Sequence, residues 1–335
     1  MKTESRVSLK PFNTFGLQAM ARKLVVLEDP MDAPAALEQY PDGMIIGGGS
    51  NILLSQDNYD VVLLNRIKGI QVIEENTDHV LVAAGSGVIW HELVLWAIAQ
   101  GYGGLENLSL IPGTVGAAPI QNIGAYGVEL KDVLEGLNYY MYEQARSSYV
   151  AVEHCQFGYR DSIFKNEWKN KGFISEVFFR LTRGQHYINS DYKALKNYLE
   201  DKDIAHPSIR QISNAVIAIR QSKLPDWNKI GNAGSFFKNP VIKDSFFESL
   251  KMDYPGIPSY PVNDRLKKIP AAWLIQEAGF KGIRFGSVGT YPLQPLVLVN
   301  YGGASASDLL HLKDTIQSAV LDIFGIELTP EVTIL

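Results

Sequence analysis

The chain has 335 residues, of which 46% are hydrophobic, and these values predict a sizeable core divided between two or three domains. Its 31 basic and 36 acidic residues give a net charge of −5, which argues against a general nucleic-acid-binding surface. Cys155 is the single cysteine, so internal disulfides and thiolate metal clusters are excluded.

Signals for export and for metal binding are also missing from the sequence. The start, MKTESRVSLKPF, lacks the apolar core of a signal peptide, and no window has the pattern of a transmembrane helix. The histidines show no HExxH-type pairing, so we expect no catalytic metal. We therefore expect a soluble, cytoplasmic protein that binds neither membranes nor nucleic acid.

Strand and helix signals alternate over the first 65 residues. Apolar runs at 23–27, 44–46 and 61–64 predict strands, and an acidic stretch at 31–40 predicts a helix. The second strand leads into a glycine-rich turn made of Gly47, Gly48, Gly49, Ser50 and Asn51. Glycines let backbone N–H groups converge on a phosphate, so this turn is a candidate anion site, although a plain tight turn explains it about as well.

The middle of the chain continues this alternation. Strands are expected at 80–84, 137–142 and 172–181, and helices at 88–100, 191–200 and 207–222. Gly101 is the natural end of the first of these helices, and we interpret Trp90 and His91 within it as packing or surface residues rather than site residues. Arg160 and Asp161 lie in a polar loop and, taken alone, indicate no more than a surface pair.

The segment 101–127 has an unusual composition. From Leu108 to Val128 it contains no charged residue and no histidine, yet it is rich in glycine and proline. A flexible linker would be polar, and Pro112 and Pro119 would interrupt a helix. We therefore expect an irregular, buried loop whose backbone N–H groups need a partner, and a large ligand carrying phosphates would provide one.

The C-terminal part carries two further candidate side chains. Ser235 follows small residues in GNAGSFFKNP, which exposes its hydroxyl, but without a nearby base partner it does not indicate a hydrolase. Glu331 lies near the middle of an expected terminal strand. Taken alone, each is most simply a strand residue. The other elements expected here are helices at 241–253, 269–279 and 305–324 and strands at 296–300 and 326–335.

Several of these segments together resemble one family, the bacterial flavoprotein reductases that make UDP-N-acetylmuramic acid (the UDP-N-acetylenolpyruvoylglucosamine reductases). The resemblance spans the whole chain in the family's order. It is carried by KPFNTFG at 10–16, GGGSN at 47–51, NRIKG at 65–69, IPGTVGAAPIQNIGAYG at 111–127, GYRDS at 158–162, GNAGSFFKNP at 231–240 and PEV at 330–332. The segment 185–223, which contains Tyr192, resembles the longer type I form of the family.

The resemblance implies an α+β fold with an FAD-binding domain of the vanillyl-alcohol-oxidase (PCMH) type in two lobes and a C-terminal α+β substrate-binding domain. The first lobe would comprise residues 1–66 with the terminal strand 326–335, the second lobe residues 67–224, and the substrate-binding domain residues 225–325. We expect a monomer, although no sequence feature specifies the oligomeric state.

The resemblance implies a two-step reduction as well. FAD would be bound non-covalently, NADPH would reduce it, and UDP-N-acetylglucosamine enolpyruvate would replace the spent nucleotide. Hydride would pass from flavin N5 to the enolpyruvyl carbon, and Ser235 would donate the proton. Arg160 and Glu331 would activate the substrate carboxylate and enol, and together with Ser235 they are the expected catalytic residues.

The remaining expected site residues also follow from the resemblance. Those near FAD are Gly47, Gly48, Gly49, Ser50, Asn51, Ile111, Pro112, Gly113, Thr114, Gly116, Ala117, Asn122, Gly124, Ile174 and Arg220. Those near the substrate are Tyr126, Tyr159, Tyr192, Lys223, Asn239 and Gln294. No metal ligand is expected.

Two other functions are compatible with such a fold. One is an FAD-dependent oxidase of the same superfamily that uses O₂ and acts on another substrate. Such oxidases often attach FAD through His or Cys, and the glycine-rich flavin loops here offer neither. The other is a catalytically silent nucleotide-sugar-binding protein, which would be expected to lack one of Arg160, Ser235 and Glu331.

Overall fold

The computed structural model describes residues 1–335, which divide into two compact units. The first unit comprises residues 1–7, 21–48 and 58–222, and the second comprises residues 8–20, 49–57 and 223–335. Neither unit is a continuous piece of chain. The division into two FAD-binding lobes and a substrate-binding domain stays a prediction.

A four-stranded sheet forms one part of the first unit. Its order is β1 (Lys2–Ser8), β2 (Met20–Leu27), β5 (Asn58–Asn65) and β3 (Met44–Ile46), and α1 (Asp32–Gln39) precedes β3 in the chain. The central strands are rich in Val and Leu, and Val25, Leu27 and Leu63 are buried together with Leu37 of α1. Burial of this apolar face fixes the strand β3, from whose end the glycine-rich turn begins.

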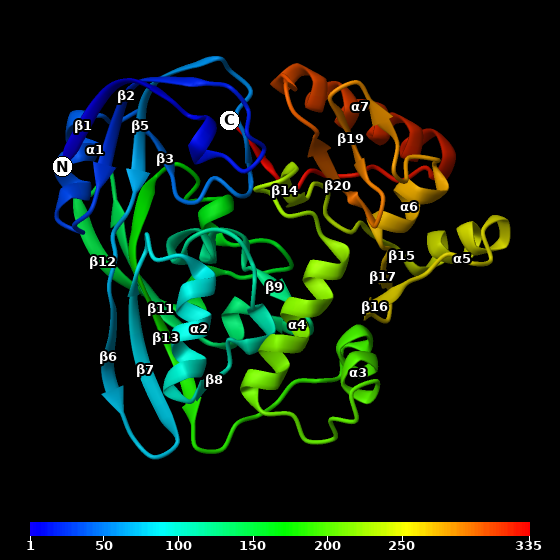
Figure 1. The fold of residues 1–335 in the computed structure, drawn as a ribbon, viewed down its shortest axis with the longest axis horizontal. Helices are drawn as coiled ribbons and strands as arrows, with labels where there is room; N and C mark the ends of the chain where they lie inside the picture. Colours follow the sequence, from blue (N-terminus) through cyan, green and yellow to red (C-terminus); the bar gives the residue numbers. More distant parts are fainter. The chain divides into compact units, whose positions relative to one another are not determined.

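A larger antiparallel sheet forms the other part of the first unit (Figure 1). Its order is β12 (Arg146–Ala151), β11 (Leu134–Met141), β13 (Gly172–Arg183), β7 (His79–Gly85) and β6 (Ile70–Glu75), and β8 (Tyr102–Gly103) pairs with the end of β13. Helix α2 (Trp90–Gln100) packs on this sheet, with the rings of Trp90 and Phe179 5.9 Å apart. Gly101 ends the helix in the left-handed conformation, as the sequence predicts.

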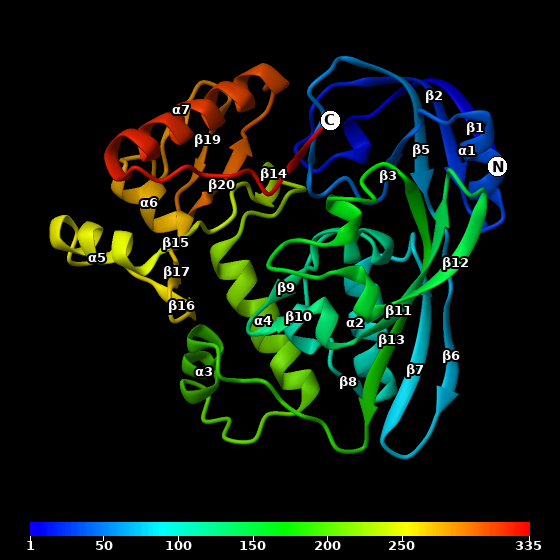
Figure 2. The same cartoon turned by 180° about the vertical axis from the view of Figure 1, so that it is seen from behind.

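Two more helices complete the first unit, α3 (Lys193–Glu200) and α4 (Ile209–Lys223). The helix predicted over 207–222 is confirmed as α4, and its apolar residues at helical spacing, Ile209, Ile212, Val216 and Ile219, are all buried. In both Figure 1 and Figure 2, α2 lies between the larger sheet and α4.

The uncharged segment lies between α2 and α4. Trp90 of α2 donates a hydrogen bond to the Leu108 carbonyl, and Ser109 is bonded to Ser213 of α4. As predicted, the segment is irregular. Together with its immediate flanks, it forms the short 3-10 turns η2 (Glu106–Leu108), η3 (Val115–Ala117) and η4 (Pro119–Gln121) and a hairpin of β9 (Gly124–Ala125) and β10 (Val128–Glu129).

The second unit contains two small antiparallel sheets. One has the order β14 (Gly231–Ser235), β20 (Gln294–Asn300), β19 (Val288–Tyr291) and β18 (Arg284–Phe285), and the other has the order β15 (Val241–Lys243), β17 (Leu266–Lys268) and β16 (Tyr260–Asn263). The helices are α5 (Asp244–Asp253), α6 (Ala271–Glu277) and α7 (Ala306–Phe324). A capping box of Ser305 and Asp308 begins α7. A parallel pair, β4 (Ile52–Leu53) and β21 (Thr333–Ile334), completes the unit.

Two predicted elements of the second unit were wrong in extent. The helix expected over 241–253 begins only at Asp244, because Val241 and Ile242 form strand β15 and pair with β17. The strand expected over 326–335 is reduced to Thr333–Ile334. Pro330 lies within that stretch and lacks the N–H that a continuous ladder requires, so only single backbone contacts form around it.

The end of α2 gives a test of backbone strain separate from packing. A Cβ on Gly101 would meet no atom within 4 Å, but its φ of +78° is unfavourable for an L-residue. We predict that Gly101→Ala lowers the free energy of unfolding by about 1 to 2 kcal/mol. The measurement is urea unfolding against Gly256→Ala, where the space is equally open and φ is ordinary. Equal stability of the two variants would contradict the prediction.

Candidate functional site

The glycine-rich turn and the uncharged segment meet inside the first unit. Gly47 and Gly48 follow β3 and pass directly against Gly113 and Thr114. A Cβ on Gly48 would lie 2.9 Å from the Cα of Gly113, a separation that real side chains do not adopt. Only glycine permits this approach of two backbones, so the structure brings together two loops that the sequence separately marks as candidate phosphate binders.

Hydrogen-bond donors remain at this contact. At the start of α2, the Trp90 N–H donates a hydrogen bond to the Gly113 carbonyl at 3.0 Å. The Val115 N–H donates to the Val88 carbonyl at 2.9 Å. The backbone N–H groups of Gly113 and Thr114 donate no hydrogen bond to protein, and the buried Thr114 hydroxyl has no partner. Buried polar groups are rarely left unpaired, and convergent N–H and O–H donors suit an anion. The residues present therefore fit the pyrophosphate of FAD.

Close backbone packing also holds Gly116, a neighbouring residue predicted to contact FAD. The Gly116 N–H donates to the Ser86 carbonyl at 2.8 Å, and a Cβ on Gly116 would lie 2.5 Å from the Ser86 side chain. Ile174 is buried in the core of the large sheet, whereas Ala117 is exposed. Ile111 and Pro112 are partly exposed and directly precede Gly113 in the chain.

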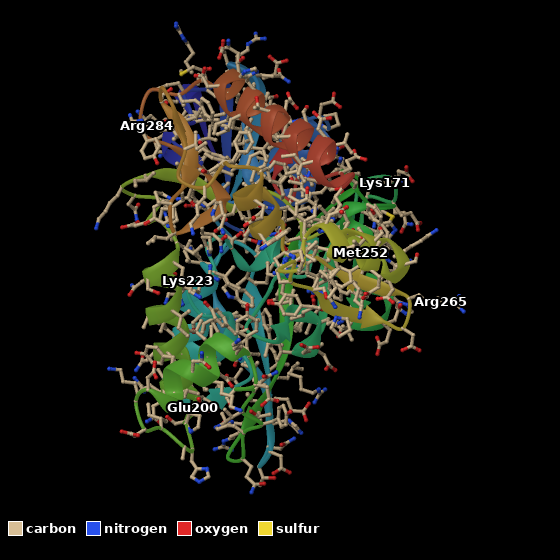
Figure 3. The ribbon with its side chains drawn as sticks, turned by 90° about the vertical axis from the view of Figure 1, so that its right-hand side faces the viewer. Lys171, Glu200, Lys223, Met252, Arg265 and Arg284 are labelled. Carbon is tan, nitrogen blue, oxygen red and sulfur yellow. The ribbon has the colours of Figure 1, made fainter.

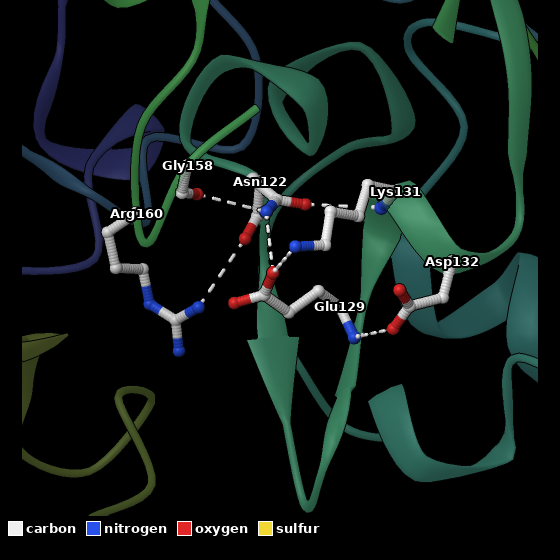
Figure 4. A network of polar contacts seen from close by, with 6 residues as sticks. All are labelled: Asn122, Glu129, Lys131, Asp132, Gly158 and Arg160. Carbon is white, nitrogen blue, oxygen red and sulfur yellow. Dashed lines mark hydrogen bonds and ion pairs between the residues drawn. The ribbon is translucent and has the colours of Figure 1, made fainter. Parts of the chain in front are cut away.

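Asn122 ties the hairpin of the segment to a distant loop (Figure 4). It is fully buried, with a φ of +44°, and its amide donates to Glu129 and to the Gly158 carbonyl, each at 3.0 Å. Its side-chain oxygen accepts from the Lys131 N–H at 3.1 Å. This buried amide therefore helps to hold 158–162 beside the hairpin.

Arg160 lies on the loop that Asn122 fixes. Its guanidinium donates to the Gly124 carbonyl at 2.6 Å and to the Asn122 carbonyl at 3.4 Å, and it lies 5.4 Å from the ring centre of Tyr159. Its φ of +53° is unusual for a residue with a side chain and indicates that the surroundings hold it in place. The structure thus brings Arg160 and Tyr159 to the predicted flavin loop.

A second arginine approaches the same region from α4. The Nε atom of Arg220 is buried without a hydrogen-bond partner, and burial lowers the pKa of its guanidinium, which nevertheless stays charged. Tyr126 and Arg160 act on it electrostatically. Tyr126 packs edge-to-face on Tyr192 with ring centres 5.3 Å apart, and its pKa is raised by burial.

Ser235 and Glu331 come together in the second unit. The Glu331 N–H donates to the Phe236 carbonyl at 2.8 Å, so the two predicted residues lie on neighbouring extended segments although 96 positions separate them. Asn51 contacts the second of these segments, because its side-chain amide donates to the Glu331 carbonyl at 3.3 Å. Both Ser235 and Glu331 are partly exposed.

The other predicted substrate residues in this unit have different environments. Asn239 uses its side-chain oxygen to accept from the Ala271 N–H at 2.9 Å, which holds the start of α6. Gln294 is the first residue of β20 and is partly buried. Lys223 is exposed at the end of α4 (Figure 3).

One contact of the site region was not predicted from the sequence. His91 accepts a hydrogen bond on Nδ1 from the Leu110 N–H at 3.0 Å, so it packs directly against the uncharged segment. Leu110 lies 19 positions after His91 in the chain. No sequence pattern indicates which side chain of the helix the returning segment will contact.

Comparisons with known proteins add independent evidence. Residues 36–143 match the family model of an FAD binding domain, and residues 225–335 match that of the UDP-N-acetylenolpyruvoylglucosamine reductase C-terminal domain. These matches confirm the predicted α+β class with a PCMH-type FAD-binding domain and the predicted FAD cofactor. No helix of the chain combines the length and apolar character that crossing a bilayer requires.

Full-length relatives carry the same name. UDP-N-acetylenolpyruvoylglucosamine reductases of Flavobacterium johnsoniae and Pseudomonas putida are 43% and 44% identical, covering 100% and 98% of this chain and 100% and 97% of their own. The crystal structure of the Thermus caldophilus enzyme (MurB) superposes with a TM-score of 0.67 over 100% of this chain and 99% of its own, at 24% identity, which supports the fold. The chain belongs to the UDP-N-acetylenolpyruvoylglucosamine reductase family.

Proposed function

We propose that the chain reduces UDP-N-acetylglucosamine enolpyruvate to UDP-N-acetylmuramate, with FAD as cofactor and NADPH as reductant. Family membership makes it an oxidoreductase of peptidoglycan precursor synthesis. The observation that carries the cofactor assignment is the contact of Gly48 with Gly113, beside which the Thr114 hydroxyl and two backbone N–H groups remain as donors.

Further residues are assigned to FAD in this proposal. Backbone donors at 113–114 and the Thr114 hydroxyl would hold the pyrophosphate, and the Arg220 guanidinium supplies a positive charge in an overall acidic chain. The full assigned set is Gly47, Gly48, Gly49, Ser50, Asn51, Ile111, Pro112, Gly113, Thr114, Gly116, Ala117, Asn122, Gly124, Ile174 and Arg220.

When bound, FAD would supply the hydride chemistry, from N5 to the terminal enolpyruvyl carbon, with NADPH as the reductant. Addition beside a carboxylate places negative charge on the substrate, and a positioned cation stabilises that charge. We assign this role to Arg160, whose planar guanidinium can bind carboxylate oxygens in bidentate fashion. Its bond to the Gly124 carbonyl orients the guanidinium before substrate arrives.

Ser235 is assigned as the proton donor to the carbon that bears the ether oxygen. A serine hydroxyl is a weak acid, but the carbon of an enolate is basic enough to take its proton. Glu331 lies on the segment beside Ser235, and we assign it to orienting the enol and carboxylate region. General-acid catalysis of this kind typically contributes ~10²–10⁴ in rate.

The rest of the substrate carries a diphosphate and a uracil ring. We assign Lys223 to the diphosphate and Tyr126, Tyr159, Tyr192 and Gln294 to further contacts. Asn239 is assigned to the uracil. Its side-chain oxygen accepts from the Ala271 N–H, which holds this side chain beside the start of α6.

The function is tested by anaerobic spectroscopy of the purified flavoprotein. We predict that NADPH bleaches the yellow protein and that UDP-N-acetylglucosamine enolpyruvate restores the colour without O₂. Recovery only after O₂ is admitted would favour an FAD-dependent oxidase acting on another substrate. Protein that takes up no FAD would contradict the flavoenzyme assignment altogether.

The proton-donor role is tested by Ser235→Ala. Because Ser235 acts after the flavin has been reduced, we predict that bleaching by NADPH proceeds at its normal rate while recovery with the enolpyruvyl substrate slows by ~10²–10⁴. Stopped-flow absorbance measures both steps. Ser307→Ala, an exposed site on α7, serves as the matched control and should leave both rates unchanged. Equal slowing of both steps in Ser235→Ala would rule out a specific proton donor.

A further inference from the structure

The first turn of α2 holds the uncharged segment at several consecutive points. The Trp90 indole donates to the Leu108 carbonyl at 2.9 Å, and His91 Nδ1 accepts from the Leu110 N–H at 3.0 Å. Three residues further on, the backbone N–H of Trp90 donates to the Gly113 carbonyl. These bonds alternate in direction along the segment, so together they restrict its rotation as well as its distance from the helix.

Leu110 adopts a backbone conformation that needs such support. Its φ of +57° lies in the left-handed region, which a leucine disfavours because its Cβ approaches the carbonyl oxygen. Leu110 directly precedes the stretch that leads to the Gly113 and Thr114 donors. A change of φ at Leu110 would therefore redirect those donors, and the Leu110 N–H is held by the imidazole of His91.

The surroundings of His91 favour the neutral imidazole. The facing segment 108–128 contains no charged residue, Arg220 acts on His91 from α4, and Glu92 is its charged neighbour on α2. Burial and the Arg220 guanidinium hold the pKa of His91 below its usual range. A neutral imidazole that accepts on Nδ1 carries its proton on Nε2.

We propose that His91 is a positioning residue of the FAD site, which holds the backbone at Leu110 so that the Gly113 and Thr114 donors face the pyrophosphate. This inference rests on the proposed FAD site. His91 acts through the segment and need not touch the cofactor itself.

A pH dependence follows from the geometry. A protonated His91 carries N–H on both ring nitrogens and can no longer accept from Leu110. FAD affinity is therefore full above the pKa of His91 and declines as the pH falls through it, by up to about tenfold per pH unit. The decline is expected at a pH below the ordinary range of a histidine, because the pKa is depressed.

The test compares two substitutions of one side chain. His91→Leu removes the acceptor, whereas His91→Asn places an amide oxygen near the position of Nδ1 and cannot be protonated in this range. His311→Leu, an exposed histidine on α7, is the matched control. Dilution of each yellow flavoprotein releases FAD, and its fluorescence gives the dissociation constant between about pH 5 and pH 8. Thermal unfolding of each variant is measured in parallel.

We expect His91→Leu to weaken FAD binding on the order of tenfold at pH 8, the size of one lost hydrogen bond. His91→Asn should bind within about threefold of the unaltered chain and lose part of its acid decline, and His311→Leu should behave as the unaltered chain. Unchanged affinity in His91→Leu, or an undiminished acid decline in His91→Asn, would overturn the proposal. Equal weakening in both His91 variants with equal loss of thermal stability would show a merely structural role. Failure of the unaltered chain to bind FAD would instead overturn the proposed function, and this inference with it.

Discussion

The structure depends on one constraint, which is that an uncharged stretch of backbone must keep a single conformation without forming a regular helix or sheet. Residues 108–128 meet this constraint through bonds to their neighbours: Trp90 and His91 hold them from α2, and Ser213 holds them from α4. The glycine turn then packs on Gly113 with no room for a side chain. The resulting surface offers N–H and O–H donors and contains no charged residue. It therefore places no carboxylate against the pyrophosphate, which carries negative charge.

The proposed reacting groups are supported differently from the cofactor loop. Arg160 is oriented by carbonyl groups of the hairpin, and the buried amide of Asn122 fixes the loop that carries it. Ser235 and Glu331 are placed by backbone pairing around Phe236. In each case backbone groups or a neighbouring amide, rather than the reacting side chains, carry the positioning. Substitution of a reacting side chain should therefore alter the chemistry more than the fold.

Much of this organisation could be predicted from the sequence, and the exceptions have physical reasons. The stripe of α4, the end of α2 at Gly101 and the irregular segment follow from spacing and from proline and glycine, which act locally. Strand β16 was not predicted because it contains Pro261, and proline is unusual inside a strand. The terminal strand was predicted too long because pairing partners, not strand propensity, decide where a ladder stops. The family resemblance named candidate residues, but it gave no partner for His91, because that partner depends on how the segment folds back.

The most direct test of this account is the FAD dissociation constant of Gly48→Ala. The added Cβ would lie 2.9 Å from the Gly113 Cα, and backbone cannot yield as a flexible side chain would. Overpacking of this kind costs about 1–3 kcal/mol, so the account predicts FAD affinity weakened by roughly 5- to 150-fold. Gly256→Ala, where a Cβ meets open space, should leave the affinity unchanged. Equal and undiminished FAD binding by both variants would contradict the claim that this backbone contact builds the cofactor site.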